Sequence, residues 1–169
     1  MQRSDPVKLW IIRHGQAAAA ESHEDDSDRP LTELGRAQAG WLGRVLSNPA
    51  HAPHRVIASP AVRTLTTARL ICEVIQPEPD EHGELSCAHG LGEAVQAVAE
   101  VFEGSNPGCG AMVGHISTFS TLVRWLIGSD GVDGVMLRTG QAALVEIRCS
   151  PTELSPGCGE LLEICRRPS

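Results

Sequence analysis

Two arginines and two histidines in this sequence stand where they could handle phosphate. Arg13 and His14 follow one short apolar run, Arg63 follows a second, and His115 follows a third. A phosphoryl group in transfer spreads negative charge over three equatorial oxygens, and guanidinium groups meet such oxygens with forked hydrogen bonds. An imidazole attacks phosphorus while one ring nitrogen is unprotonated, and a hydrogen bond from the other nitrogen to a backbone carbonyl would set that tautomer. These residue types therefore predict phosphoryl transfer with His14 as the nucleophile.

Strands and helices alternate in the elements that must position these residues. Apolar runs predict strands over residues 7–12, 55–58, 111–113, 142–147 and 161–164. Apolar residues at helical spacing predict helices after Thr32, after Pro60, around residues 91–102 and after His115. This alternation favours an α/β fold, a three-layer α/β/α sandwich with a mostly parallel central sheet.

The order of these elements also predicts where a site lies, because ligands of such sheets collect beyond the carboxyl ends of the strands. His14, Arg63 and His115 fall there, and Arg13 stands next to His14. Gly15 leaves no side chain beside the nucleophile, which would let the backbone turn tightly and let phosphate come close. The two prolines of residues 76–82 predict a loop, and residues 108–110 predict a turn.

Length and composition narrow the remaining possibilities. With 169 residues and 18.0 kDa, we expect one domain over residues 1–169. A formal net charge of -7 argues against nucleic acid or an anionic membrane as the main partner. No apolar run approaches the ~20 residues of a membrane span, and no long apolar stretch precedes Arg13. We therefore expect a cytoplasmic protein. The six cysteines contain no CxxC pair and the domain is large enough to fold without disulfides, so we expect reduced thiols.

Four separated motifs resemble those of the histidine phosphatase superfamily and occur in that family's order. The first is Arg13-His14-Gly15, at the end of the first predicted strand. The others are Arg29-Pro30-Leu31-Thr32-Glu33-Leu34-Gly35, then Ser59-Pro60-Ala61-Val62-Arg63 with Thr67-Ala68, then Val113-Gly114-His115. The compact chain looks most like the SixA branch, the phosphohistidine phosphatases that act on phosphorylated signalling domains.

This resemblance implies a phosphoglycerate mutase-like fold with a phosphohistidine intermediate at His14. It also implies a phosphate-binding pocket formed by Arg13, Arg63 and His115, beside Gly15, and it supplies no required cofactor. Larger members insert a substantial cap after the second helix, whereas residues 77–109 leave room for a short loop and one helix. We therefore expect a minimal cap and an open site, which suits a phosphate carried on a protein.

The proton donor is the least defined part of the predicted site. Sugar-phosphate members of the family carry a glutamate acid in a Leu-x-Glu segment, where this chain has Leu85-Ser86-Cys87. Glu84 is a possible proton donor by family analogy, and Glu93 and Asp26 stay open as alternatives. The substrate-adjacent Gln16 stands where SixA proteins often have an acidic residue, and its amide cannot act as a carboxylic acid. An acid-poor site favours phosphohistidine, since a protonated N-phosphoimidazole releases neutral imidazole.

The sequence therefore predicts a metal-independent phosphatase that acts through His14, most directly on phosphohistidine of signalling proteins. A small-molecule phosphomonoesterase and a non-catalytic module that binds phosphoproteins are the alternatives. The partner is accordingly a phosphorylated protein or a small phosphorylated molecule, and nothing in the sequence indicates an oligomeric state. No metal site is expected: a proline separates the histidines of residues 51–54, and the acidic run at residues 24–28 lacks the glycine and distal glutamate of a calcium loop.

Overall fold

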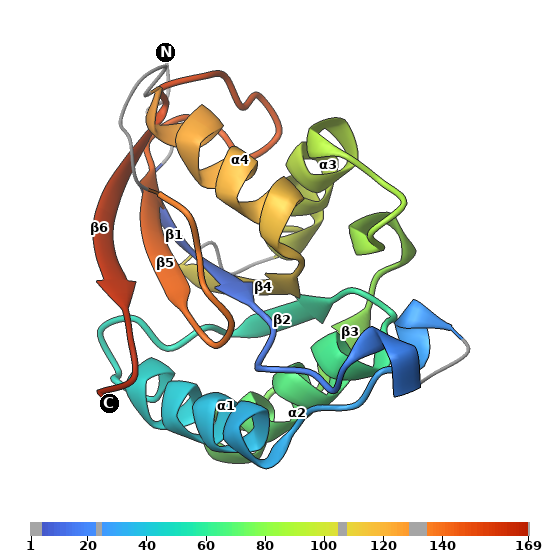
Figure 1. Ribbon diagram of the computed structural model, residues 1–169. Helices are drawn as coiled ribbons and strands as arrows, with labels where there is room; N and C mark the ends of the chain where they lie inside the picture. The colour runs from blue at the N-terminus through green and yellow to red at the C-terminus, as the bar shows by residue number, and fades with distance from the viewer. Residues whose placement is uncertain (1–4, 23–24, 105–107, 129–134, 169) are drawn as a thin grey trace.

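A mixed sheet lies at the centre of the computed structural model, which describes residues 5–22, 25–104, 108–128 and 135–168 (Figure 1). The described strands form a six-stranded sheet with the spatial order β3 (Pro79–Glu81), β2 (Arg55–Ala58), β4 (Cys109–Gly114), β1 (Val7–Arg13), β5 (Ala142–Ile147) and β6 (Gly159–Cys165). Strands β1 to β4 pair in parallel, whereas β5 and β6 pair antiparallel. The sheet is therefore mostly parallel, as predicted.

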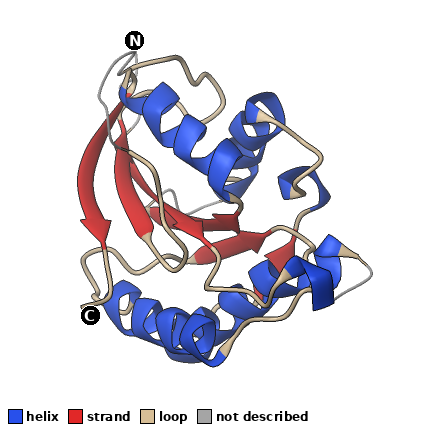
Figure 2. Cartoon of the chain, in the orientation of Figure 1, coloured by secondary structure: helices blue, strands red, loops and turns tan. Residues whose placement is uncertain are grey.

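Helices cover both faces of this sheet (Figure 2). The long helices are α1 (Glu33–Leu46) and α2 (Val62–Ile75) on one face, and α3 (Leu91–Val101) and α4 (Ile116–Ile127) on the other. Three short 3-10 turns in the described residues are η1 (Ala20–Ser22), η2 (Asp26–Asp28) and η3 (Gly83–Leu85). The predicted three-layer α/β/α sandwich is thus confirmed.

Strand β1 contains a continuous apolar run at residues 9–12. Leu9 and Ile11 pack into the core under α3 and α4, whereas Trp10 and Ile12 pack into the core under α1 and α2. All four side chains are at most 1% exposed. Because a parallel strand with helices on both faces buries both of its sides, the run has no polar alternation. Burial on both faces fixes the strand whose end carries Arg13 and His14.

Helix starts and ends follow the residues that the sequence places there. The Oγ1 of Thr32 accepts the N–H of Gly35 at 3.1 Å and caps α1, as predicted. At α3, the carboxylate of Glu93 accepts the N–H of Gly90 at 3.0 Å. Gly128 ends α4 with a φ of 68°, a left-handed conformation that glycine adopts without strain. These caps set where each helix meets the end of the strand before it.

Two local predictions were wrong. Residues 76–82 are not all loop, because Pro79–Glu81 forms the edge strand β3 beside β2. A proline at the first position of an edge strand removes no hydrogen bond that the sheet needs, which is why so polar a segment still pairs. Residues 108–110 are not simply a turn either, since β4 begins at Cys109 and Gly110 pairs with Leu9.

The segment between α2 and β4 forms no cap domain in its described residues. The buried face of α3, formed by Ala94, Ala97, Val98 and Val101, packs into the core between the sheet and helices α3 and α4. The segment therefore completes the outer helical layer, in agreement with the expected minimal cap. None of the described helices is long and apolar enough to cross a membrane.

Candidate active site

Three neighbouring parallel strands end at one edge of the sheet and bring the predicted site residues together. His14 follows β1 and donates its backbone N–H to Gly114 at 3.1 Å, and Ser59 follows β2 and donates to Val113 at 3.0 Å. His115 follows β4, and Arg63 lies in the first turn of α2. Although they are polar, His14, Arg63 and His115 are 7%, 3% and 8% exposed. The strand order thus assembles residues that are a hundred positions apart in the sequence.

The imidazole of His14 is held in one tautomer. Its Nδ1 lies 2.7 Å from the carbonyl oxygen of Gly15, and a carbonyl can only accept, so Nδ1 carries the proton and donates it. Nε2 is then the unprotonated nitrogen. Burial, together with the positive charge of Arg63, lowers the pKa of His14 to about 4 despite this hydrogen bond. The side chain is therefore a neutral imidazole with an unprotonated Nε2 at neutral pH, as the predicted role of nucleophile requires.

His115 is oriented by two neighbours. Nη2 of Arg63 lies 3.4 Å from Nδ1 of His115, and an arginine can only donate, so Nδ1 accepts. Nε2 of His115 then donates to the Oγ of Ser59 at 2.8 Å. Burial and the Arg63 charge lower the pKa of His115 to about 4. The rings of His14 and His115 meet edge to face with centroids 5.6 Å apart, so two neutral imidazoles share the site.

The guanidinium groups of Arg13 and Arg63 keep unused donors. Arg13 donates from Nη1 to the carbonyl of Leu137 at 3.0 Å. Within the described part of the chain, the Nε atoms of Arg13 and Arg63 are both buried and have no hydrogen-bond partner. A buried charged donor without a partner is unfavourable and calls for an explanation such as an absent ligand. An oxyanion that accepts from both Nε–H groups would remove this deficit.

Asp26 of η2 makes a contact that the sequence analysis did not predict. Arg63 donates to the backbone carbonyl of Asp26 at 2.5 Å and to its Oδ2 at 2.9 Å. The same carboxylate accepts from Nε of Arg29 at 2.8 Å. The exposed acidic segment therefore lies against the buried arginine of the site, with residue 24 of the acidic run outside the described residues.

The three candidate acids differ in their surroundings. Desolvation acts to raise the pKa of Asp26, but Arg29 and Arg63 lower it overall, so this carboxylate stays ionised at neutral pH. Hydrogen bonds from the backbone of Glu93 and Gly90 lower the pKa of Glu93, which serves as the cap of α3. Glu84 lies in η3, directly after β3 at the same edge of the sheet, and its Oε2 is buried without a partner among the described residues. Among the three candidate donors, Glu84 is thus the one with a buried carboxylate oxygen that lacks a hydrogen-bond partner among the described residues.

Gly15 has a packing role that differs from the expected one. Its φ is not positive, so no tight turn requires glycine there. A Cβ at Gly15 would lie 2.5 Å from the carbonyl oxygen of Gly35 in α1, and its N–H donates to the Oγ1 of Thr67 at 3.1 Å. The glycine therefore lets the backbone after the nucleophile pack against α1 and α2, and its contact with phosphate stays a prediction.

Gln16 is exposed and joins the site loop to α1. Its backbone N–H donates to Oε1 of Gln38 at 2.8 Å, and its side-chain Oε1 accepts from the Oγ1 of Thr32 at 2.8 Å. The side chain thus stabilises the start of α1. Its proximity to substrate stays a prediction.

Sequence reasoning missed three residues that support the site: Ser59, Thr67 and Asp26 as a partner of Arg63. Ser59 directly follows a predicted strand, and Thr67 lies one helical turn after Arg63, whose carbonyl accepts its Oγ1–H at 2.7 Å. Ser59 and Thr67 belong to the same family motif as Arg63, so the motif could have indicated them. Asp26 is a candidate acid in the sequence, and no periodic pattern links it to Arg63.

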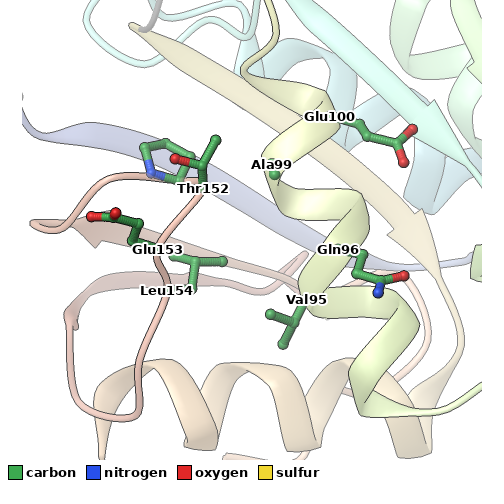
Figure 3. Close-up of a pocket in the computed structure, with 8 residues that line it drawn as sticks. Val95, Gln96, Ala99, Glu100, Thr152, Glu153 and Leu154 are labelled. Atoms are coloured by element: carbon green, nitrogen blue, oxygen red, sulfur yellow. The ribbon is translucent and has the colours of Figure 1, made fainter.

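The rest of the described chain offers no cluster of metal ligands, and it holds a groove that lies apart from the candidate site. No three His, Cys, Asp or Glu side chains of the described residues cluster so that they could hold a metal ion. A groove of about 440 Å³ runs between α3 and residues 151–154 (Figure 3). Figure 3 shows Val95 and Gln96 of α3 on one side of it and Leu154 on the other. None of the candidate site residues lines this groove.

Comparisons with known proteins agree with this geometry. The sequence model of the histidine phosphatase superfamily (branch 1) matches residues 9–86. An uncharacterized protein of Picosynechococcus sp. strain PCC 7002 is 28% identical over 110 residues, which cover 64% of this chain and 66% of that protein. The match thus spans slightly less than two thirds of that relative.

Solved structures agree over nearly the whole chain. The candidate phosphohistidine phosphatase SixA of Nakamurella multipartitia has a TM-score of 0.80, with 24% identity and 98% of each chain covered. The protein histidine phosphatase SixA solved with tungstate has a TM-score of 0.76, with 23% identity and 94% and 96% of the two chains covered. At these identities the likeness shows a shared fold. The resemblance predicted from the motifs is confirmed.

Proposed function

We propose that this chain, which resembles the histidine phosphatase superfamily in sequence motifs and in fold, is a metal-independent phosphatase that removes phosphate from phosphohistidine on a signalling protein. The family match supports phosphatase activity, and the SixA neighbours share the fold. The substrate class is our inference from the chemistry of the site.

The reaction has two displacements at phosphorus. The lone pair on Nε2 of His14 forms a bond to phosphorus while the bond to the substrate's imidazole nitrogen breaks, and that imidazole leaves neutral. Water then attacks the phosphorus, the bond from phosphorus to Nε2 breaks, and both protons of the water leave with the released phosphate. His14 leaves as the neutral imidazole, because its proton stays on Nδ1 and is donated to the carbonyl of Gly15 throughout. The guanidinium groups of Arg13 and Arg63 balance the charge on the equatorial oxygens. In this scheme the imidazole of His115, once it has gained a proton, donates a hydrogen bond to the phosphate.

The observation that carries the proposal is the pairing of a nucleophile and an anion site at one point. His14 is neutral and fixed as its Nδ1–H tautomer, and two buried Nε–H donors beside it lack partners among the described residues. Neutral imidazole and unsatisfied guanidinium donors are what attack on a phosphoryl group needs. The ionised state of Asp26 and Glu93 favours a substrate whose leaving group needs no strong acid.

One observation favours a second candidate function, hydrolysis of a small phosphate ester. Glu84 stands after β3, two strands from His115 in the order of the sheet, with a buried and unpartnered carboxylate oxygen. Neighbouring strands are about 4.8 Å apart, so the end of β3, three residues before Glu84, lies about 10 Å from the end of β4. A long substrate could bridge this distance, and Glu84 would then protonate an alkoxide leaving group.

Turnover with matched substrates tests the proposal. In the presence of a chelator, we would measure phosphate released from a phosphohistidine peptide and from sugar and aryl phosphates. Wild type should prefer the peptide, and His14→Ala should release nothing. His54→Ala is the matched control, because His54 is exposed and precedes β2 at the opposite edge of the sheet.

Other results would redirect the assignment. A preference for an ester that disappears in Glu84→Gln would establish the small-molecule reaction instead. Phosphopeptide binding without turnover in both wild type and His14→Ala would identify a binding module and refute the enzymatic proposal.

A further inference from the structure

Three arginines line a pocket beside the candidate nucleophile. The pocket has a volume of about 200 Å³ and is lined by Gln38 of α1, residues 138–141, and Arg166 and Arg167 after β6. Arg138, Arg166 and Arg167 are all exposed. In a chain with a formal net charge of -7, this pocket is a local region of positive charge.

Backbone hydrogen bonds fix the position of this pocket relative to the site. Gly140 donates its N–H to the carbonyl of His14 at 2.9 Å, and Gln141 accepts the N–H of Arg13 at 3.0 Å. Consecutive Cα atoms are about 3.8 Å apart, so the Cα of Arg138 lies within about 8 Å of that of Gly140. A Cβ at Gly140 would lie 2.6 Å from the Cβ of Gln38, which shows how closely this turn packs on α1. The turn that carries Arg138 is therefore fixed against the strand end that carries His14. Ala142 pairs with Cys165, which places Arg166 and Arg167 at the same end of the sheet.

Charges around the site are distributed unevenly. Within the described residues, Arg138, Arg166 and Arg167 have no carboxylate partner, whereas Arg63 is paired with Asp26. The exposed acids Glu21, Asp25, Asp26 and Asp28 lie in the loop that holds η1 and η2. Figure 1 shows η2 beside α2 and β3, and the C-terminal end of the chain on the other side, beside α1. The site thus lies between an acidic side and a basic side.

We propose that the pocket formed by Arg138, Arg166 and Arg167 docks an acidic segment of the phosphorylated protein substrate. This inference rests on the proposed function and names the chemistry of the partner. Carboxylates flanking the phosphohistidine on one side would meet the arginines, and the acidic loop would repel them on the other side. Such complementarity fixes the direction in which the partner lies across the site. The pocket is open and its guanidinium groups are exposed, which suits a protein surface better than an enclosed small molecule.

Paired peptides test this proposal. Two phosphohistidine peptides of equal length, one flanked by glutamates and the other by glutamines, would be compared with free phosphohistidine. At low salt, wild type should hydrolyse the acidic peptide with a kcat/KM about tenfold higher than that of the glutamine peptide. The factor is modest because each exposed charge pair contributes little, and it should shrink at high salt because salt screens these pairs. The triple variant Arg138→Gln, Arg166→Gln and Arg167→Gln should lose this preference through a higher KM, with turnover of free phosphohistidine unchanged.

The controls separate this proposal from the proposed function. Arg124→Gln removes an exposed arginine from α4 and should keep the wild-type preference. Fluorescence anisotropy with the unphosphorylated acidic peptide reports docking without catalysis, so it gives a result even if phosphohistidine is not hydrolysed. Equal affinity of wild type and the triple variant for that peptide would overturn the docking proposal. A parallel loss of activity on free phosphohistidine would also overturn it, because the arginines would then act on the phosphate itself.

Discussion

Acid should destabilise the fold through His14 in a way that can be calculated. In the unfolded chain its imidazole gains a proton near pH 6.5, whereas burial keeps the folded imidazole neutral down to a pKa of about 4. The folded state therefore binds fewer protons between these values and loses stability as the pH falls. The shift predicts a loss of about 2 kcal/mol between pH 7 and pH 5 and about 3 kcal/mol by pH 4.

Comparison with His14→Asn isolates this effect from all other titrating groups. We would measure urea unfolding of wild type and variant at several pH values, after checking that their m-values agree. The difference in unfolding free energy should fall by about 2 kcal/mol from pH 7 to pH 5, because asparagine does not titrate. NMR titration of the His14 imidazole should give a midpoint near 4. A constant free-energy difference, or a midpoint near 6.5, would refute the assignment of His14 as a buried neutral imidazole.

Four further predictions concern packing, charge and thiol reactivity. Gly35→Ala should destabilise the fold by about 1–3 kcal/mol in urea unfolding, because its Cβ would collide with the backbone of the site loop. Gly92→Ala, at an exposed position of α3 with no neighbouring atom, should instead stabilise the fold by about 0.5–1 kcal/mol. Asp26→Asn should tighten binding of inorganic phosphate several-fold by calorimetry, since a carboxylate no longer opposes the anion at the buried arginine, and unchanged affinity would place the phosphate elsewhere. Alkylation followed by mass spectrometry should label the exposed Cys87 first and spare Cys109, because burial raises the pKa of the Cys109 thiol to about 12.

Much of the fold was predictable because its elements depend on local patterns. Residues 9–12 are apolar on both faces, a pattern that predicts a buried strand, and Thr32 caps the helix that follows it. Strand β3 was not predictable, since Pro79–Glu81 is short and polar and pairs only because β2 offers it an edge. Its existence depends on a neighbour rather than on its own residues.

The same distinction holds within the site. The positions of His14, Arg63 and His115 follow from strand ends, which a sequence pattern marks. The packing of Gly15 against Gly35 and the ion pair between Asp26 and Arg63 depend on distances between elements that no periodicity encodes. Sequence therefore predicts which residues meet at the sheet edge, and the structure is needed to find what holds them.

The pairing of β1 with distant strands has a consequence for when the site can exist. Arg13 pairs with Gly114 of β4, and Ile12 pairs with Ala142 of β5, so the first strand of the chain is completed by strands from its second half. Contacts of such large sequence separation form late, after the entropy of closing a long loop has been overcome. During synthesis His14 is made early, but the neighbouring strand β4 and the His115 that follows it are made only after about two thirds of the chain. The candidate site is thus assembled as one of the last events of folding, once the two halves of the chain have met.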